Sequence, residues 1–236
     1  ADLDAARALL DRSLTLDPDS SYTHSLLAYC LYHQALLVWT TTDPTGLAAT
    51  YLEVSRRAVE LDDNNWLGHA LLGMSVLWCL RDYATAESEV QRAALLNPSA
   101  ALAHQFNGCV YNFNGQPEAA LPYLAAALKL NPGPISATLL LSDMSLAHLL
   151  TGDLDQAVTY ARRAISKYNG NSRAWERLTA ALGLQGRIDE AEGCFRAMAD
   201  IRGVPDRAYL DMTYPFRDPA HRDILMGGLA AAGLEV

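Results

Sequence analysis

Small and large apolar residues recur along this chain in blocks of similar length, and each block predicts two amphipathic helices joined by a short turn. Residues 101–132 show the pattern best. Gly108 and Ala120 stand where two paired helices must approach closely, while Tyr111 and Leu124 fill the space between them. The pattern therefore predicts an all-α chain of stacked helix pairs.

Equivalent positions recur in phase along the chain. The position that follows each second helix is occupied in turn by Pro18, Asp63, Pro98, Pro132 and Asn169, at spacings of 45, 35, 34 and 37 residues. A small residue recurs at the closest helix–helix contact, at Ala6, Ala86, Ala120, Ala157 and Ala191. Because five copies agree, the pattern predicts a repeat rather than a chance match.

The repeats predict the helices and the domain organisation. Helix pairs are expected at 22–39 with 44–61, 65–80 with 83–96, 101–114 with 117–130, 136–151 with 154–167, and 172–185 with 188–200. A half repeat at 3–16 precedes them and a last helix follows at about 219–231. We expect repeats over 1–203, with a prong-like insertion near 36–46, and a linker with a capping helix over 204–236.

The blocks resemble the tetratricopeptide repeat, whose pattern is W-x2-L-G-x2-Y…A-x3-F…P. The matching residues in the clearest block are His104, Gly108, Tyr111, Ala120, Leu124 and Pro132. The resemblance implies an all-α fold, namely an α-solenoid of tetratricopeptide helix-turn-helix repeats with a C-terminal capping helix. It also implies a non-catalytic role in protein binding.

Longer segments resemble the C-terminal region of bacterial class III adenylate cyclases that carry tetratricopeptide repeats. These segments are residues 56–62, 69–73, 92–98, 214–219 and 228–234. The resemblance implies the C-terminal part of a multidomain bacterial signalling protein. The same region also occurs behind winged-helix DNA-binding domains, so a transcriptional regulator stays open as the parent protein. No catalytic residue of a cyclase domain has a counterpart here.

Charge and cysteine usage narrow the function classes. The net charge of −9 disfavours nucleic acid and anionic membranes as partners. No uninterrupted apolar run is long enough for a membrane helix. The cysteines, Cys30, Cys79, Cys109 and Cys194, are far apart and show neither a disulfide nor a zinc pattern. We therefore expect a cytoplasmic location.

No motif for catalysis or cofactor binding is visible. The sequence lacks G-x-S-x-G, H-E-x-x-H, C-x-x-C, G-x-G-x-x-G and the P-loop. His24, His69 and His104 each lie six residues after the position that follows a second helix, where the repeat prefers tryptophan. They are predicted to pack between helices, and we expect no enzyme activity, no metal and no cofactor.

The first helices of the first three full pairs contain no Asp, Glu, Lys or Arg. In tetratricopeptide solenoids these helices line the concave face. Either they are buried and need no charge, or they form a groove for an apolar or aromatic polypeptide. The predicted groove consists of Tyr29, Tyr32, His33, Trp78, Gln105, Asn112 and Phe113, with Tyr32, Trp78 and Phe113 as anchors.

The expected partner is a protein or peptide segment, or an effector domain of the parent protein. A free carboxylate tail fits poorly, because the positions that grip it in chaperone-binding family members are uncharged in the first four full pairs. The alternative is a small-ligand sensor that uses the same groove. The half repeat should leave Leu9, Leu10 and Leu14 partly bare, which predicts a weak homodimer through that end.

Overall fold

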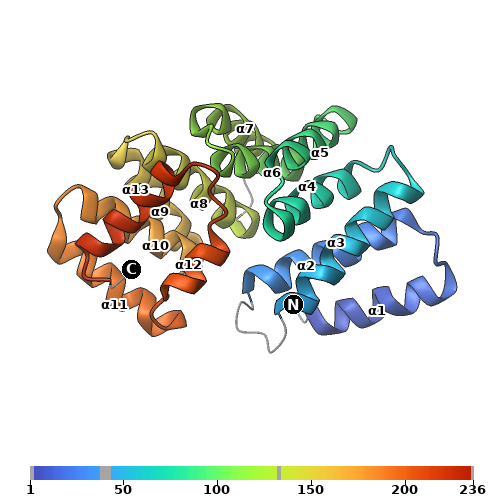
Figure 1. The fold of residues 1–236 in the computed structure, drawn as a ribbon, viewed down its shortest axis with the longest axis horizontal. Coiled ribbons are helices and arrows are strands. Elements are labelled where there is room, and N and C mark those ends of the chain that lie inside the picture. Colours follow the sequence, from blue (N-terminus) through green and yellow to red (C-terminus); the bar gives the residue numbers. More distant parts are fainter. Residues whose placement is uncertain (1–2, 38–43, 132–133, 235–236) are drawn as a thin grey trace. The chain divides into compact units, whose positions relative to one another are not determined.

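A computed structural model describes residues 3–37, 44–131 and 134–234, and these residues form helices joined by turns, without a strand (Figure 1). The helices are α1 (Leu3–Leu16), α2 (Ser21–Leu37), α3 (Pro44–Leu61), α4 (Trp66–Leu80), α5 (Tyr83–Leu96), α6 (Ala101–Phe113), α7 (Pro117–Leu130), α8 (Pro134–Leu150), α9 (Leu154–Lys167), α10 (Ser172–Leu184), α11 (Ile188–Arg202), α12 (Arg207–Thr213) and α13 (Pro219–Ala231). The predicted helix bounds that fall on described residues are confirmed to within two residues, whereas residues 38–39, the predicted end of the helix at 22–39, lie outside them. Among the described helices only the short α12 was not predicted.

The helix ends follow from local chemistry. Asn65, Asp82, Asp153 and Asn171 precede helices, and each side chain accepts hydrogen bonds from backbone N–H groups in the first turn. Three of the turns within helix pairs contain a glycine with positive φ, at Gly115, Gly152 and Gly186. A side chain there would be strained, so glycine favours the reversal between paired helices.

The prong predicted near residues 36–46 stays a prediction. The helices that flank it, α2 and α3, have 17 and 18 residues, but α8 also has 17, so helix length does not distinguish this pair. The predicted tip, residues 38–43, lies outside the described part of the chain.

The chain divides into two compact units, Ala1–Val110 and Tyr111–Val236. In the first unit each helix from α1 to α4 packs on the next, and α2 also packs on α4. One close approach is at Gly73, where a Cβ atom would lie 2.6 Å from Cγ1 of Val90 and 2.9 Å from the carbonyl of Ala86. This glycine is the Gly of the repeat pattern, so its role in close packing is explained directly.

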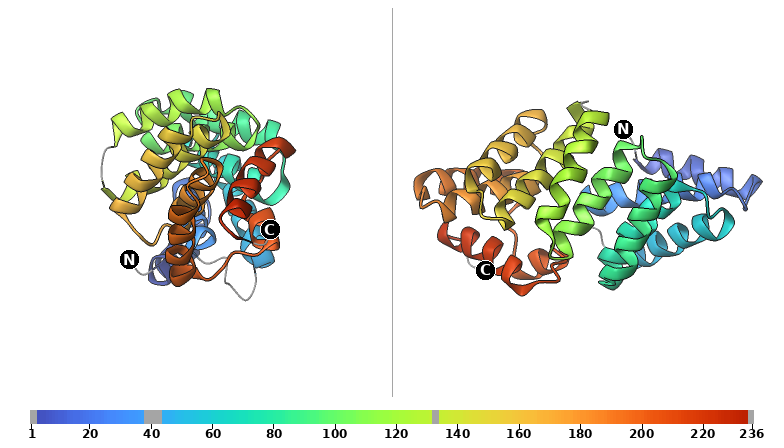
Figure 2. Two further views of the ribbon diagram at one scale, coloured as in Figure 1. Left: turned by 90° about the vertical axis from the view of Figure 1, so that its left-hand side faces the viewer. Right: turned by 90° about the horizontal axis from the view of Figure 1, so that it is seen from above.

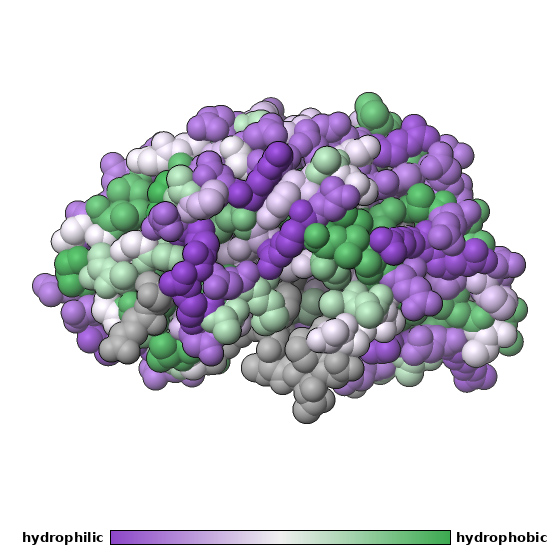
Figure 3. Space-filling view, in the orientation of Figure 1, coloured by the Kyte–Doolittle hydropathy of each residue, from purple (hydrophilic) through white to green (hydrophobic). Residues whose placement is uncertain are grey.

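In α1 no residue is buried, although the helix packs on α2. Leu9 is 68% exposed, while Leu10 and Leu14 are half-buried. Large exposed apolar residues also occur singly on other helices, such as Leu95 on α5 and Leu130 on α7. On the face seen in Figure 3, hydrophilic and hydrophobic residues are interspersed.

In the second unit, consecutive helices from α7 to α11 pack as antiparallel pairs, and α8 also packs on α10 (Figure 2). The last helix, α13, packs on α10 and to a lesser extent on α8. The capping helix therefore contacts the first helices of the last two pairs. Gly183 and Gly228 allow this approach, because a Cβ on either would collide with backbone atoms of the facing helix.

No helix among the described residues has the length and apolar character needed to cross a membrane.

Candidate functional site

An aromatic cluster in the first unit joins two first helices. Tyr29, Tyr32 and His33 lie on α2, and Phe106 lies on α6. The ring centroids of Tyr29 and His33 are 4.5 Å apart, those of Tyr32 and His33 are 5.2 Å apart, and those of Tyr32 and Phe106 are 5.1 Å apart. These edge-on contacts are the favoured geometry of aromatic pairs. The cluster thus holds its rings in a fixed arrangement.

The exposed part of this cluster is uncharged at neutral pH. Tyr29 and His33 are half-buried. Burial lowers the pKa of His33, so its imidazole is neutral, and burial raises the pKa of the Tyr29 phenol. The surface therefore offers ring faces, a phenol and a neutral imidazole to a contacting molecule.

The other predicted groove residues of the first unit differ in exposure. Trp78 on α4 is partly exposed, whereas Gln105 on α6 is buried. Tyr32 is only 8% exposed, because it packs between its α2 neighbours and Phe106. The expectation that Tyr32 presents its ring to a partner is therefore corrected: it supports the cluster from inside.

Phe113 is also buried, for a reason the repeat pattern does not contain. Its side chain has 0% exposure and contacts Phe216 at 5.2 Å and Tyr214 at 6.3 Å between ring centroids. The neighbouring Asn112 is buried and donates from Nδ2 to the carbonyl of Asp143 at 3.0 Å. The expected anchor Phe113 is thus a core residue, covered by the C-terminal part of its own chain.

The C-terminal segment, which we define as residues 206–218, lies on first helices of the second unit. The Arg217 N–H donates to the carbonyl of Phe113 at 2.9 Å, and Nη1 of Arg217 donates to Oδ1 of Asn114 at 2.9 Å. At the other side, the hydroxyl of Tyr214 donates to Oε2 of Glu176 at 2.5 Å. One extended stretch is therefore held at the end of α6 and at α10 at once.

Beneath this segment α10 presents buried charges. Glu176 and Arg177 are each 1% exposed, and Arg173 is also buried. The guanidinium carbons of Arg173 and Arg177 lie 5.5 and 5.8 Å from the centroid of the Tyr214 ring, within cation–π range. Burial, followed by the charge of Glu176, raises the pKa of Tyr214 well above its ordinary value, so the phenol keeps the proton that it donates.

Sequence reasoning did not predict this set of contacts. A signal was present, since α10 carries Arg173, Glu176 and Arg177, whereas the first helices of the first three full pairs carry no charge. Charged residues on an otherwise uncharged face indicate a polar neighbour, which here is Tyr214.

The three repeat-position histidines have a structural role. Nε2 of His24, His69 and His104 lies 3.0, 2.9 and 2.8 Å from the carbonyl oxygen six residues earlier. Trp175 occupies the same repeat position and donates from Nε1 to the carbonyl of Asn169 at 2.7 Å. Each ring therefore bonds a carbonyl in the turn between repeats, a contact that histidine and tryptophan can both make. Only His69 of the three histidines is buried, as the predicted packing between helices requires.

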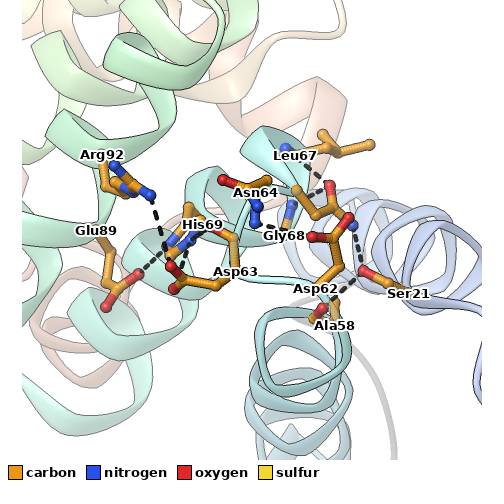
Figure 4. Close-up of polar contacts among 11 residues, drawn as sticks. Ser21, Ala58, Asp62, Asp63, Asn64, Leu67, Gly68, His69, Glu89 and Arg92 are labelled. Atoms are coloured by element: carbon orange, nitrogen blue, oxygen red, sulfur yellow. Dashed lines mark hydrogen bonds and ion pairs between the residues drawn. The ribbon is translucent and has the colours of Figure 1, made fainter.

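His69 has an additional partner, shown in Figure 4. Its Nδ1 lies 2.6 Å from Oε2 of Glu89, while its Nε2 contacts the carbonyl and, at 3.6 Å, the carboxylate of Asp63. Burial lowers the pKa of His69, but the hydrogen bonds to Glu89 and Asp63 and the charges of both carboxylates outweigh it and leave the pKa raised. In its protonated form the ring can donate from both nitrogens, and the raised pKa shows that these acceptors favour that form.

Three of the cysteine thiols have a raised pKa. Burial raises the pKa of Cys79 to about 11 and also raises the pKa of Cys30 and Cys194. These groups are therefore protonated at neutral pH, and the thiol is not the nucleophilic form. Among the described residues no group of three or more His, Cys, Asp or Glu side chains is arranged to hold a metal ion.

Comparison with known proteins agrees with this fold. The family model of the tetratricopeptide repeat matches residues 107–172 and 142–207, so this part of the chain carries tetratricopeptide repeats. No curated protein matches the chain significantly in sequence.

Several solved structures share the fold. YrrB, a tetratricopeptide protein with an unusual peptide-binding site, matches with a TM-score of 0.52 and 18% identity over 85% of this chain and 94% of its own. The Cut9–Hcn1 hetero-tetramer matches with 0.71 and 14% over 96% of this chain and 40% of its own. A thermophilic tetratricopeptide protein of Thermus thermophilus matches with 0.59 and 23% over 76% and 90%. The chain therefore has the all-α fold of tetratricopeptide-repeat proteins.

Proposed function

We propose that this chain is a protein-interaction module that binds an extended polypeptide segment on the uncharged aromatic surface formed by Tyr29, His33 and Trp78. One observation carries the proposal: these partly exposed rings lie on first helices, and Tyr29 and His33 are held in place by the buried Tyr32. Rigid aromatic side chains provide a large contact area at low cost in conformational entropy, which suits them as binding anchors.

The second unit supports the proposed polypeptide binding, because it shows that first helices of this chain can hold an extended segment. Its first helices already hold a polypeptide stretch, Tyr214 to Arg217, through ring contacts, a backbone hydrogen bond and side-chain hydrogen bonds. A first-helix face of this protein is therefore chemically suited to an extended segment.

To test the proposal, peptides that bind the chain are selected from a random display library. The affinity of the selected peptide is then measured for the wild type and for variants. We expect Tyr29→Ala to weaken binding by about 2 kcal/mol or more, as for other aromatic anchors. Tyr168→Ala is the matched control, because Tyr168 is a 52% exposed tyrosine in the turn after α9. Equal affinities for the wild type and Tyr29→Ala, or equal losses in both variants, contradict the proposal.

We further propose that the module works in the cytoplasm as part of a bacterial signalling protein such as a class III adenylate cyclase, with a winged-helix regulator as the alternative. This support comes only from the resemblance of segments such as 56–62, 92–98 and 214–219. Reading the coding sequence upstream of this region tests it: a cyclase domain is expected, and a DNA-binding domain favours the alternative.

A further inference from the structure

The contact between the C-terminal segment and α10 is polar at its centre. The Tyr214 hydroxyl bonds Oε2 of Glu176, and the Tyr209 hydroxyl donates to Oε1 of the same carboxylate at 3.3 Å. Two arginines stack on the Tyr214 ring. Two tyrosine hydroxyls therefore converge on one buried carboxylate, between two buried cations.

The buried arginine Arg177 is only partly satisfied. Its Nη1 donates to Oγ of Ser142 at 2.7 Å and contacts Oδ1 of Asp143 at 3.2 Å. Its Nε and Nη2 atoms are buried and have no hydrogen-bond partner within the described ranges. Buried donors without partners are costly, and buried ion pairs stabilise a fold poorly compared with apolar packing. If the segment left this face, water could satisfy these donors, so the charges are compatible with a surface that is exposed part of the time.

The opposite end of the segment is also held by groups that water can satisfy. Arg217 bonds the carbonyl of Phe113 and the side chain of Asn114 after α6. Between the two polar ends, Phe216 packs on Phe113. This face thus contacts three features of the segment in order: Glu176 binds a tyrosine hydroxyl, Phe113 packs on an aromatic ring, and Asn114 binds an arginine.

We propose that residues 214–217, Tyr-Pro-Phe-Arg, are an exchangeable internal ligand, and that the face formed by Phe113, Asn114, Glu176 and Arg177 binds a partner segment of the same chemistry, a tyrosine followed by an aromatic residue and an arginine, when the internal segment leaves. This inference rests on the proposed polypeptide binding but concerns the second unit. Glu176 selects tyrosine over phenylalanine, since phenylalanine would leave the buried carboxylate without its donor.

The test is an engineered, reducible disulfide in the full chain that holds the internal segment in place. A Cβ atom at Gly115 would lie 3.7 Å from Cβ of Asp218, within the separation of about 3.5–4.5 Å that a disulfide spans. The variant Gly115→Cys/Asp218→Cys therefore ties the end of the segment to the turn after α6 when oxidised. The reduced form of the same variant is the matched control, because it carries the same altered turn and the same lost helix cap.

The probe is a fluorescent synthetic peptide of residues 206–218, whose binding is followed by anisotropy. We expect saturable binding to the reduced variant and at least a tenfold weaker affinity for the oxidised one. A peptide with Tyr214→Phe should bind at least about tenfold more weakly, because one hydrogen bond to a charged group is lost. Saturating peptide should also accelerate amide exchange of Arg217 in the reduced protein, because that N–H leaves the carbonyl of Phe113.

Equal affinity of the oxidised and reduced forms, or no saturable binding to the reduced form, overturns the inference. A dimer whose disulfide joins position 115 of one copy to position 218 of another also overturns it, since that link shows that a second copy supplies the segment; peptide mapping distinguishes it from a dimer through the native cysteines. Tyr29→Ala is expected to leave binding of this peptide unchanged. If Tyr29→Ala weakens the library-selected peptide while the engineered disulfide has no effect here, the proposed function stands and this inference fails.

Discussion

Replacing Glu89 with glutamine should remove a pH-dependent stabilisation of the first unit. His69 is 4% exposed, and within the described part of the chain its ring nitrogens contact acceptors: the Asp63 carbonyl and the carboxylates of Glu89 and Asp63. A neutral imidazole carries one N–H, so deprotonation would leave a ring nitrogen facing an acceptor oxygen at 2.6 or 2.9 Å. The charged form is therefore the one that fits.

The sign of the pH effect follows from the raised pKa of His69. A group with a higher pKa in the folded state contributes stability below its unfolded pKa, near 6.5, and loses that contribution as the pH rises through the folded pKa. Since a hydrogen bond to a charged group contributes about 1.5–3 kcal/mol, the wild type should be more stable than Glu89→Gln by about this amount near pH 5.5. The difference should shrink as the medium becomes alkaline.

The assay is an NMR titration of the His69 ring, combined with amide exchange in α4 at several pH values. Local measurements are needed because the chain contains two compact units, so one global unfolding curve mixes both. Glu53→Gln is the control, since it makes the same charge change at an exposed site on α3. A wild-type His69 that titrates at or below the ordinary histidine value, or an unchanged titration in Glu89→Gln, would refute the reasoning.

Three further changes test the packing. Gly228→Ala should lower the stability of α13 against local unfolding by about 1–3 kcal/mol, because the new methyl group collides with the Ala180 backbone. Gly227→Ala is the control: its methyl group meets nothing within 4 Å, so it should be neutral or slightly stabilising. Amide exchange in α13 distinguishes the two variants. Asn65→Ala should lower the free energy of unfolding by about 1–2 kcal/mol, since Asn65 caps α4 and also donates to the hydroxyls of two serines. Amide exchange in the first turn of α4 should become faster, and unchanged exchange contradicts this. Phe106→Ala should cost about 3–5 kcal/mol in thermal unfolding, because the ring is 1% exposed, and a melt near wild type would contradict its core position.

Most of the fold could be predicted from the sequence because its determinants are local. Helix bounds follow from apolar periodicity and from capping residues such as Asp82 and Asn171, which act within one turn. The close helix contacts follow from small residues at fixed repeat positions, such as Gly73 against Val90. The histidine position was also predicted, although its hydrogen bond to the carbonyl six residues earlier was not.

The candidate site could be predicted only in part, because exposure depends on distant segments. Phe113 looks available within its own repeat, but the stretch that covers it lies about a hundred residues later, where Arg217 bonds its carbonyl. Tyr32 is buried by Phe106 of another repeat. Periodicity within one repeat contains no information about either partner, so Tyr29, His33 and Trp78 remain the proposed contact residues.

The most direct test of polypeptide binding on the first unit is photo-cross-linking from position 29. A photoreactive phenylalanine analogue replaces Tyr29 and keeps an aromatic ring at the partly exposed edge of the cluster. The same analogue at position 168 is the control, in an exposed turn of the second unit. We predict that the library-selected peptide cross-links from position 29 and not from position 168; cross-linking from position 168 alone, or from neither position while the peptide is bound, would contradict the account.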